Sequence, residues 1–340
     1  MHSQRTIFLL ALAFVLVLSP TSSAQTVDNV LAVDTAWARL LTLVAPRSPG
    51  SAPDLPTDWT AIAAEAAKFR QDFPDSSEAR SAARIELTAR VRIEEQAVVL
   101  SPGITTAVGV YLRDTSNQPR DRLQLKIVFD QANLRRTRYE SYEAGLEAQA
   151  GHARELMSDF PDQPDGYGYL LSLARLAPPT LASGLAGQLL ANKNTPARFV
   201  AMALRIADRP ALLGQPLRLD GAEAAIRTAA GKTLVVYSWR MDDEGFRSIL
   251  KQMSSLADVV FIGINLDEDL AAARKAADGL PGKQFYDGGG LDGPKATQLK
   301  LVLPTMVYLV DGQGIVRDVD AHRAPYGALT RFIASKRSAQ

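Results

Sequence analysis

The spacing of hydrophobic positions changes along the chain and predicts two structural regions. From Thr26 to about Ala207, apolar residues recur mostly three or four positions apart, which is typical of amphipathic helices. From about Gly214, short apolar runs alternate with helically spaced segments, which is typical of layered α/β structure. We therefore expect an α plus α/β chain, with an all-helical domain over 25–210 and an α/β/α sandwich over 212–340.

Local signals define several segments of the helical region. Thr57-Asp58 can cap a helix whose apolar face carries Ile62 and Phe69. The preceding segment 46–56 is rich in Pro, Ser and Gly and is expected to be a loop. The apolar residues of 101–135 could form strands or helices, and the helical surroundings favour helices.

A short motif occurs twice in the helical region. Asp-Phe-Pro-Asp stands at 72–75 and again at 159–162, each time at the end of a predicted helix. Proline stops a helix and begins a turn, so the motif resembles the turn of a tetratricopeptide-type hairpin. The copies are too far apart for a regular short-period array. Two helix ends built from common local chemistry are an equally good explanation.

The second region predicts two buried strands, a β-hairpin and three helices. The strands cover Leu234–Tyr237 and Val259–Ile264, and the hairpin runs over 306–319 around an Asp-Gly turn. The helices are expected over Phe246–Met253, Leu270–Ala277 and Tyr326–Ser335. The Gly-containing segment Gly279–Pro294 is expected to be a loop.

Residues 1–24 have the pattern of a secretory signal peptide. Arg5 precedes an apolar stretch from Ile7 to Leu18, and small residues ending at Ala24 offer a cleavage site. The alternative is a membrane anchor, but the apolar stretch is shorter than the about 20 residues that a span needs. We expect cleavage near Ala24, a periplasmic or extracellular location, and no integral membrane segment in the mature chain.

Composition excludes several classes of function. Lys plus Arg total 38 and Asp plus Glu total 37, so the balanced charge gives no reason to expect nucleic acid as a partner. The 340 residues contain three histidines and no cysteine, which excludes a His/Cys zinc site. We expect no metal and no cofactor.

Three segments of the second region carry a family resemblance. They are Gly231–Trp239, Phe261–Asp269 and Leu303–Gly312, in that order. Together they resemble exported thioredoxin-like domains of the TlpA/ResA or AhpC/TSA type, over about residues 212–337. In that family the first strand leads into a Trp-containing loop that bears Cys-x-x-Cys.

The chain departs from the family at the redox motif. If Trp239 matches the family's Trp, the cysteines would fall near Asp243 and Phe246. Thiol–disulfide exchange needs an attacking thiolate and passes through a mixed disulfide, for which carboxylates cannot substitute. Thiol–disulfide oxidoreductase or peroxidase activity is therefore excluded by the sequence.

The resemblance also implies a peptide-binding groove. In the family, the proline that matches Pro304 follows a cis peptide bond and faces the redox motif, and partner peptides pair with the backbone beside it. The residues that would form this groove are Trp239, Asp243, Phe246, Leu303 and Pro304. We expect this groove to bind an extended chain by strand addition.

Other candidate chemistry has structural explanations. The acidic clusters 242–244 and 265–269 stand at predicted helix starts, where carboxylates act as caps. Gly288–Gly290 lack the Lys-Ser/Thr that follows in a phosphate-binding loop. His152 and His322 lie in a helix and a loop without triad partners, and we expect both at the surface.

The sequence favours an exported, redox-inactive protein that binds a protein or peptide partner without catalysis. Two alternatives stay open. The thioredoxin scaffold could support an enzyme of non-thiol chemistry that uses Asp243 or its neighbours, or the C-terminal domain could be purely structural.

Overall fold

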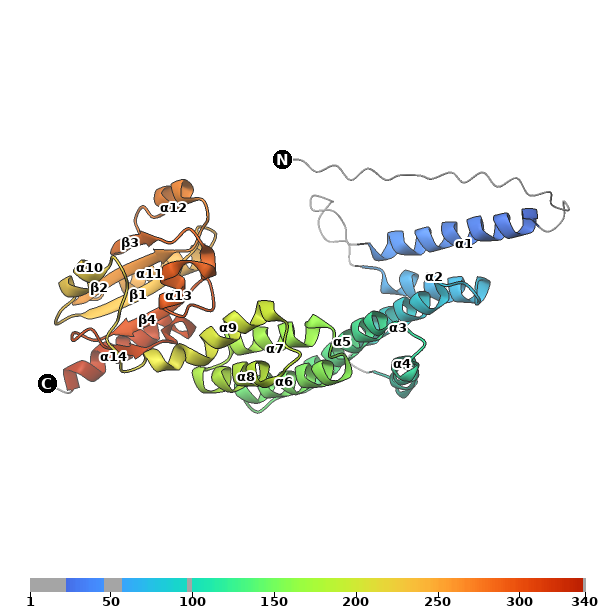
Figure 1. The fold of residues 1–340 in the computed structure, drawn as a ribbon, viewed down its shortest axis with the longest axis horizontal. Coiled ribbons are helices and arrows are strands. Elements are labelled where there is room, and N and C mark those ends of the chain that lie inside the picture. The colour runs from blue at the N-terminus through green and yellow to red at the C-terminus, as the bar shows by residue number, and fades with distance from the viewer. Residues whose placement is uncertain (1–22, 46–56, 97–99, 339–340) are drawn as a thin grey trace. The chain divides into compact units, whose positions relative to one another are not determined.

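The computed structural model describes residues 23–45, 57–96 and 100–338 (Figure 1). The expected loop 46–56, and all but the last two residues of the expected signal peptide, lie outside these ranges. Within the described ranges, no helix combines the length and the apolar character that crossing a membrane would require.

The chain divides into two compact units, the first ending at Thr137 and the second beginning at Arg138. The change from helices to alternating strands and helices comes later, after a short 3₁₀ helix η1 (Arg209–Leu212). The boundary between the two compact units therefore differs from the boundary between the all-helical and the α/β segments. The domain boundaries 25–210 and 212–340 remain a prediction.

The first unit is helical. Its helices are α1 (Ser23–Val44), α2 (Trp59–Asp72), α3 (Ala79–Gln96), α4 (Pro102–Arg113) and α5 (Pro119–Arg136). The helical interpretation of 101–135 is confirmed. Proline stands at the start of both α4 and α5, where its missing N–H costs nothing, and the Ser101 side chain caps α4.

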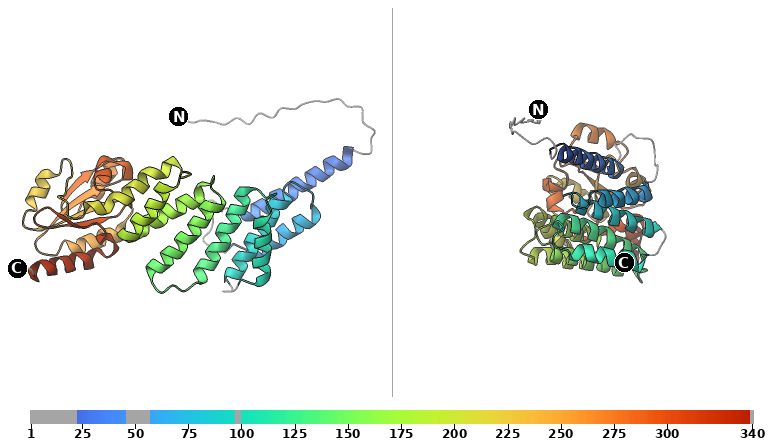
Figure 2. Two further views of the ribbon diagram at one scale, coloured as in Figure 1. Left: turned by 60° about the horizontal axis from the view of Figure 1, so that its bottom comes forward. Right: turned by 90° about the vertical axis from the view of Figure 1, so that its right-hand side faces the viewer.

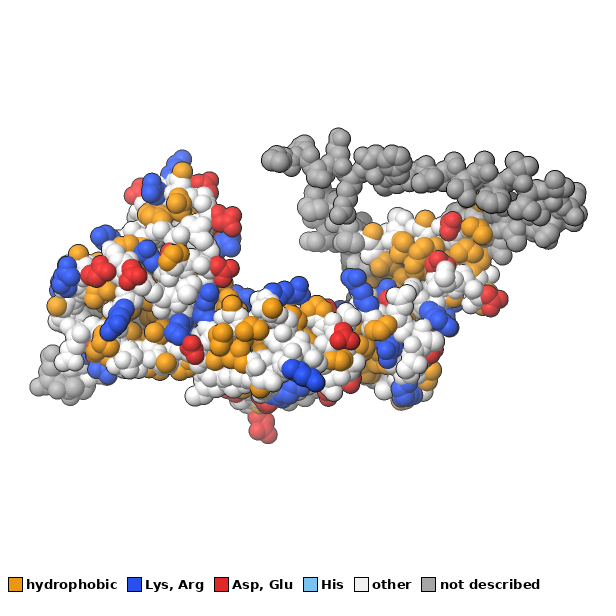
Figure 3. Space-filling model, in the orientation of Figure 1, with side chains coloured by type: hydrophobic (Ala, Val, Ile, Leu, Met, Phe, Trp, Pro, Cys, Tyr) orange, Lys and Arg blue, Asp and Glu red, His pale blue; other side chains and the backbone are white. Residues whose placement is uncertain are grey.

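Two apolar clusters hold these helices together. The first cluster, which includes Leu40, Phe69 and Ile85, joins α1, α2 and α3, and the second joins α3, α4 and α5. On α1 the covered side is centred on Leu40, while Val30 and Leu31 are exposed. Figure 3 shows hydrophobic side chains gathered over α1, so its apolar stripe is only partly covered within the described residues.

The second unit begins with four helices: α6 (Tyr142–Asp159), α7 (Pro164–Leu176), α8 (Pro179–Ala191) and α9 (Ala197–Asp208). Figure 2 shows α6, α7 and α8 side by side. Their buried residues belong to the same apolar cluster as residues of the sheet that follows. These helices and the α/β layer therefore share one core.

The two Asp-Phe-Pro-Asp segments adopt the same conformation. Phe73 has φ −133° and ψ 58°, and its N–H donates to the Phe69 carbonyl. Phe160 has φ −133° and ψ 62°, and its N–H donates to the Leu156 carbonyl. The repeated sequence thus produces a repeated turn, between α2 and α3 and between α6 and α7.

A five-stranded sheet forms the centre of the α/β region. Its strands are β1 (Thr233–Trp239), β2 (Val259–Asn265), β3 (Lys283–Tyr286), β4 (Val307–Val310) and β5 (Val316–Asp318), in the order β3-β2-β1-β4-β5. β1, β2 and β3 run parallel, whereas β4 and β5 pair antiparallel. A parallel βαβ core extended by a terminal hairpin is the thioredoxin-like arrangement, which confirms the predicted fold.

Alternation along β1 builds the two outer layers. Val235 and Tyr237 point to one face, where α11 (Glu244–Met253) and α14 (Pro325–Ser338) pack. Leu234 and Val236 point to the other face, into the cluster that includes the helices before the sheet and α13 (Pro294–Gln298). Two short helices complete the region, α10 (Glu223–Thr228) and α12 (Leu270–Ala276).

One expectation about this region is wrong. The segment Gly279–Pro294 is not simply a loop, because it contains β3 and a 3₁₀ turn η2 (Gly290–Asp292). The strand has no apolar run, and its side chains are exposed or half-buried at the sheet edge. Parallel pairing with β2 supplies the order that local hydropathy does not indicate.

Candidate functional site

Asp243, near which the family resemblance places the first cysteine, makes two hydrogen bonds within the domain. Asp243 is the N-cap of α11, and its Oδ1 accepts a hydrogen bond from the Phe246 N–H at 2.9 Å. Its Oδ2 accepts one from the Thr305 hydroxyl at 2.8 Å. One side chain thus ties the helix start to the loop before β4, which confirms the capping role expected for this acidic cluster.

The two aromatic residues of the predicted groove are core residues. Trp239 is 0% exposed and Phe246 is 5% exposed. The Phe246 ring packs edge-on against Tyr237 at 6.1 Å between centroids. Neither aromatic side chain presents a face on which a peptide could lie.

Hydrogen bonds through Gln284 hold the Trp239 side chain in place. Its indole Nε1 donates to Gln284 Oε1 at 3.0 Å, and Gln284 Nε2 donates to the Tyr237 hydroxyl at 2.8 Å. Gln284 can pack this closely against β2 because residue 263 is a glycine; a Cβ there would stand 2.0 Å from Gln284 Oε1. Burial raises the pKa of Tyr237, which keeps the phenol neutral.

The peptide bond before Pro304 is trans, so the cis bond implied by the family resemblance is wrong. Trans is the lower-energy isomer of X–Pro bonds. The loop is held by other contacts, since Thr305 donates to Asp243 and the Met306 N–H donates to Ser238 Oγ at 2.9 Å. Leu303 and Pro304 are half-buried, and peptide binding beside them stays a prediction.

The second acidic cluster is also committed to local bonds. Asp269 Oδ1 accepts from the backbone N–H groups of Ala271 and Ala272, which confirms a cap, here at α12. Asp267 has a different role, because its Oδ2 accepts from the Met241 N–H and from Asn265 Nδ2. It joins the loops that follow β1 and β2.

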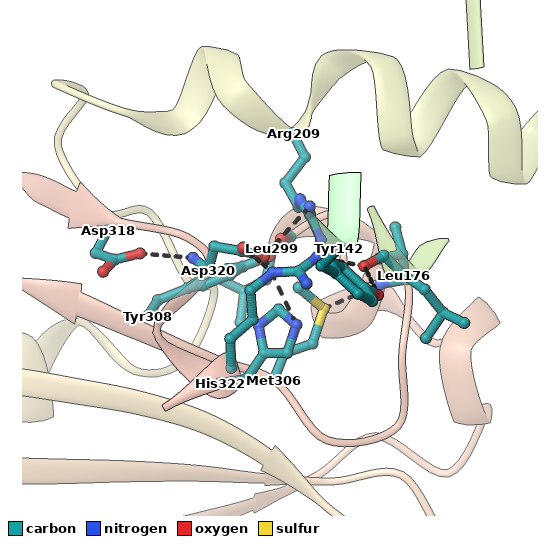
Figure 4. A network of polar contacts seen from close by, with 11 residues as sticks. Tyr142, Leu176, Arg209, Leu299, Met306, Tyr308, Asp318, Asp320 and His322 are labelled. Atoms are coloured by element: carbon teal, nitrogen blue, oxygen red, sulfur yellow. Dashed lines mark hydrogen bonds and ion pairs between the residues drawn. The ribbon is translucent and has the colours of Figure 1, made fainter. Parts of the chain in front are cut away.

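A buried charged cluster was missed by the sequence analysis (Figure 4). Arg209 is 0% exposed, and its Nη2 lies 3.6 Å from Asp320 Oδ1. His322 Nε2 lies 3.6 Å from the same oxygen, and Arg323 also pairs with Asp320. No hydropathy signal marks a buried arginine, and Arg209 follows directly on the end of a helix.

Burial dominates the protonation of this cluster. It raises the pKa of Asp320 despite the neighbouring arginines. Burial, together with the positive charges of Arg209 and Arg323, lowers the pKa of His322 to about 4. His322 is therefore neutral near pH 7, and the cluster joins η1 to the end of the hairpin as an internal contact.

The expected surface position of both histidines is wrong. The His322 side chain is 9% exposed, under the cluster of Arg209 and Asp320. His152 is 6% exposed, with its ring edge-on to Tyr169 of α7. Each lies where one layer of the second unit covers another.

An open groove of about 520 Å³ lies on the first unit, over α2, α3 and α4. Its apolar part includes Ala83 and Leu87 of α3 and Ala107 and Val110 of α4. Charged residues also line it: Arg70, Arg80, Arg90, Glu86 and Asp114. No motif in the sequence pointed to these residues, because they follow the ordinary periodicity of amphipathic helices.

Comparisons with known proteins identify two similar solved structures. No family model matches the chain, and no curated protein matches it. The C-terminal domain of a proposed thiol-disulfide oxidoreductase from Bacteroides thetaiotaomicron is 18% identical, over 31% of this chain and 84% of that one, with a TM-score of 0.25. A thioredoxin-like protein from Bacteroides caccae is 14% identical, over 68% of this chain and 95% of that one, with a TM-score of 0.32.

These TM-scores are low, so the fold assignment rests on the strand order and pairing of the sheet. The sequence has no cysteine, so this domain lacks the Cys-x-x-Cys motif. The C-terminal region therefore has a thioredoxin-like fold without cysteine, and Asp243, near which the family resemblance places the first cysteine of the redox motif, caps α11.

Proposed function

We propose that this protein is exported and binds a protein partner without catalysis. Its helical hairpins supply the binding surface, and its thioredoxin-like domain is redox-inactive. The observation that carries the proposal is the Asp243 carboxylate, whose two oxygens bond Phe246 and Thr305. These two bonds tie the start of α11 to the loop before β4. We call this part of the domain, around Asp243 and Thr305, the closed edge; the family resemblance places the redox motif there.

Two features support the helices as the binding surface. Both Asp-Phe-Pro-Asp turns have the same backbone conformation, as expected for hairpins of tetratricopeptide type. Stacked hairpins of this kind usually present extended surfaces to other proteins. The groove over α3 and α4 offers such a surface, and Val110 within it is 57% exposed.

Site-specific photo-crosslinking in the producing cells tests the proposal. A photoreactive phenylalanine analogue is placed at Val110 in the groove, at Asp242 beside the closed edge, or at Lys251 on the outer side of α11 as a control; all three positions are exposed. We expect an adduct with another protein from position 110 and none from 251. No adduct from any position would overturn the proposal.

An adduct from position 242 but not from 110 has a different meaning. Partner binding would stand, but the binding surface would be the loop that contains Leu303 and Pro304. This outcome would support the strand-addition groove that the sequence resemblance implies.

A further inference from the structure

The groove on the first unit has an apolar centre and basic ends. Along α3, the lining residues are Arg80, Ala83, Leu87 and Arg90, which are three or four positions apart and so share one face of the helix. Facing them from α4 are Ala107 and Val110. The aliphatic side chains thus lie between two arginines of the same helix.

Charge in the groove is unequal. Arginines at 70, 80 and 90 face two carboxylates, Glu86 and Asp114. Glu86 lies beneath two of the arginines, with Arg70 Nη1 at 2.6 Å from one oxygen and Arg90 Nη1 at 3.7 Å from the other. Its side chain is 13% exposed, whereas those of Arg70 and Arg90 are 46% and 44% exposed. The accessible charge at this end is therefore positive.

At the other end of the groove, around Arg80 and Asp114, the excess of positive charge is smaller. Arg80 donates to the Ser116 carbonyl at 3.1 Å. Asp114 Oδ1 accepts from the hydroxyl and the N–H of Ser116, and these bonds, hydroxyl first, lower the pKa of Asp114. Asp114 is thus ionised at neutral pH and offsets part of the charge of Arg80. The Arg70–Arg90 end carries the larger excess.

We propose that this groove binds an acidic peptide segment of the partner, with aliphatic side chains over Ala107 and Val110 and carboxylates against Arg90 and Arg80. The inference rests on the proposed function, because it names the chemistry of the partner. Exposed arginines select carboxylates and speed encounter, and the aliphatic centre favours a segment that also carries aliphatic side chains. The net charge of the chain is +1, so the attraction comes from this local arrangement and not from the whole molecule.

Fluorescence anisotropy with three labelled hexapeptides tests the inference on the purified chain. The probes are Asp-Glu-Leu-Leu-Glu-Asp, its basic counterpart Lys-Lys-Leu-Leu-Lys-Lys, and Asp-Glu-Gly-Gly-Glu-Asp without aliphatic side chains. We expect saturable binding of the first alone, weakened about tenfold when the ionic strength rises from about 0.05 M to about 0.5 M.

A pair of charge reversals locates the site. Arg90→Glu places a carboxylate beside Glu86, and the control Arg135→Glu places one beside Glu95, which Arg135 contacts outside the groove at 2.7 Å. We expect Arg90→Glu to weaken binding of the acidic probe about tenfold or more and Arg135→Glu to change it less than about twofold. Equal effects of the two reversals would overturn the inference.

The outcomes separate the inference from the function on which it rests. If the acidic probe fails to bind while position 110 still crosslinks to a partner, partner binding stands and the acidic chemistry is wrong. If the chain sediments as a dimer that Val110→Asp dissociates, a second copy fills the groove and the inference is wrong. If nothing crosslinks and no probe binds, both fail.

Discussion

The closed edge at Asp243 and the open groove on α3 use charged side chains in opposite ways. At the closed edge, both oxygens of Asp243 accept hydrogen bonds from the protein itself. In the groove, Glu86 neutralises its arginines only in part, and Arg70 and Arg90 stay well exposed. The carboxylate of Asp243 is thus bonded within the protein, whereas the guanidinium groups of Arg70 and Arg90 are available to a partner.

This comparison shows why the thioredoxin-like fold does not assign a function to the chain. A fold supports many activities, and function depends on the site that it carries. Here the residues that the family resemblance places at the redox site stabilise the domain instead. Trp239 and Phe246, which the family resemblance places at the groove, lie in the core.

The largest expected effect concerns Trp239. Trp239→Ala should lower the free energy of unfolding by about 3–5 kcal/mol, because it removes a fully buried aromatic ring and the donor to Gln284. Urea denaturation measures this, with Tyr326→Ala on the exposed face of α14 as the control. A loss below about 1 kcal/mol would show that Trp239 is not a core residue.

The buried cluster gives a pH dependence. Burial holds the pKa of His322 at about 4, below the value of about 6.5 in the unfolded chain. Between these values the unfolded chain binds more protons, so the contribution of His322 is present above about pH 6.5 and is lost as the pH falls toward 4. Asp320 acts in the opposite sense, because its folded-state pKa is raised.

The variant His322→Gln isolates this contribution. We expect wild type to lose stability relative to His322→Gln between pH 7 and pH 4.5, by on the order of 2 kcal/mol. Urea denaturation of both proteins at both pH values measures the difference. If the difference between the two proteins is independent of pH, His322 is not held neutral by burial.

A smaller effect tests the closure itself. Asp243→Ala removes the cap of α11 and the bond from Thr305, and should cost about 1–2 kcal/mol. Asp243→Asn keeps one acceptor oxygen and should cost less than half as much. Equal losses would show that the cap bond from the Phe246 N–H, which Asn can keep, contributes little to stability.

The smallest effect is expected at Pro304. The peptide bond before it is trans and the residue is half-buried, so Pro304→Ala should change stability by less than about 1 kcal/mol. Partner binding should not change either. A loss of partner with retained stability would move the binding site back to the closed edge.

The sequence predicted the strands β1, β2 and the hairpin because buried strands give continuous apolar runs. It missed β3, where Lys283 and Gln284 break any such run and tertiary pairing decides the structure. Candidate site residues were predicted less well, since the helical pattern located Asp243 at a helix start but could not show that its second oxygen accepts from Thr305. Arg209 could not be found, because its partners Asp320 and His322 lie more than a hundred residues away in the chain.

The dissociation constant of the crosslinked partner, measured for wild type, Val110→Asp and Pro304→Ala, decides which surface binds the partner. The account predicts that Val110→Asp, which puts a carboxylate into the groove, weakens binding about tenfold or more, while Pro304→Ala stays within about twofold of wild type. The reverse pattern, with binding lost in Pro304→Ala and kept in Val110→Asp, would contradict it.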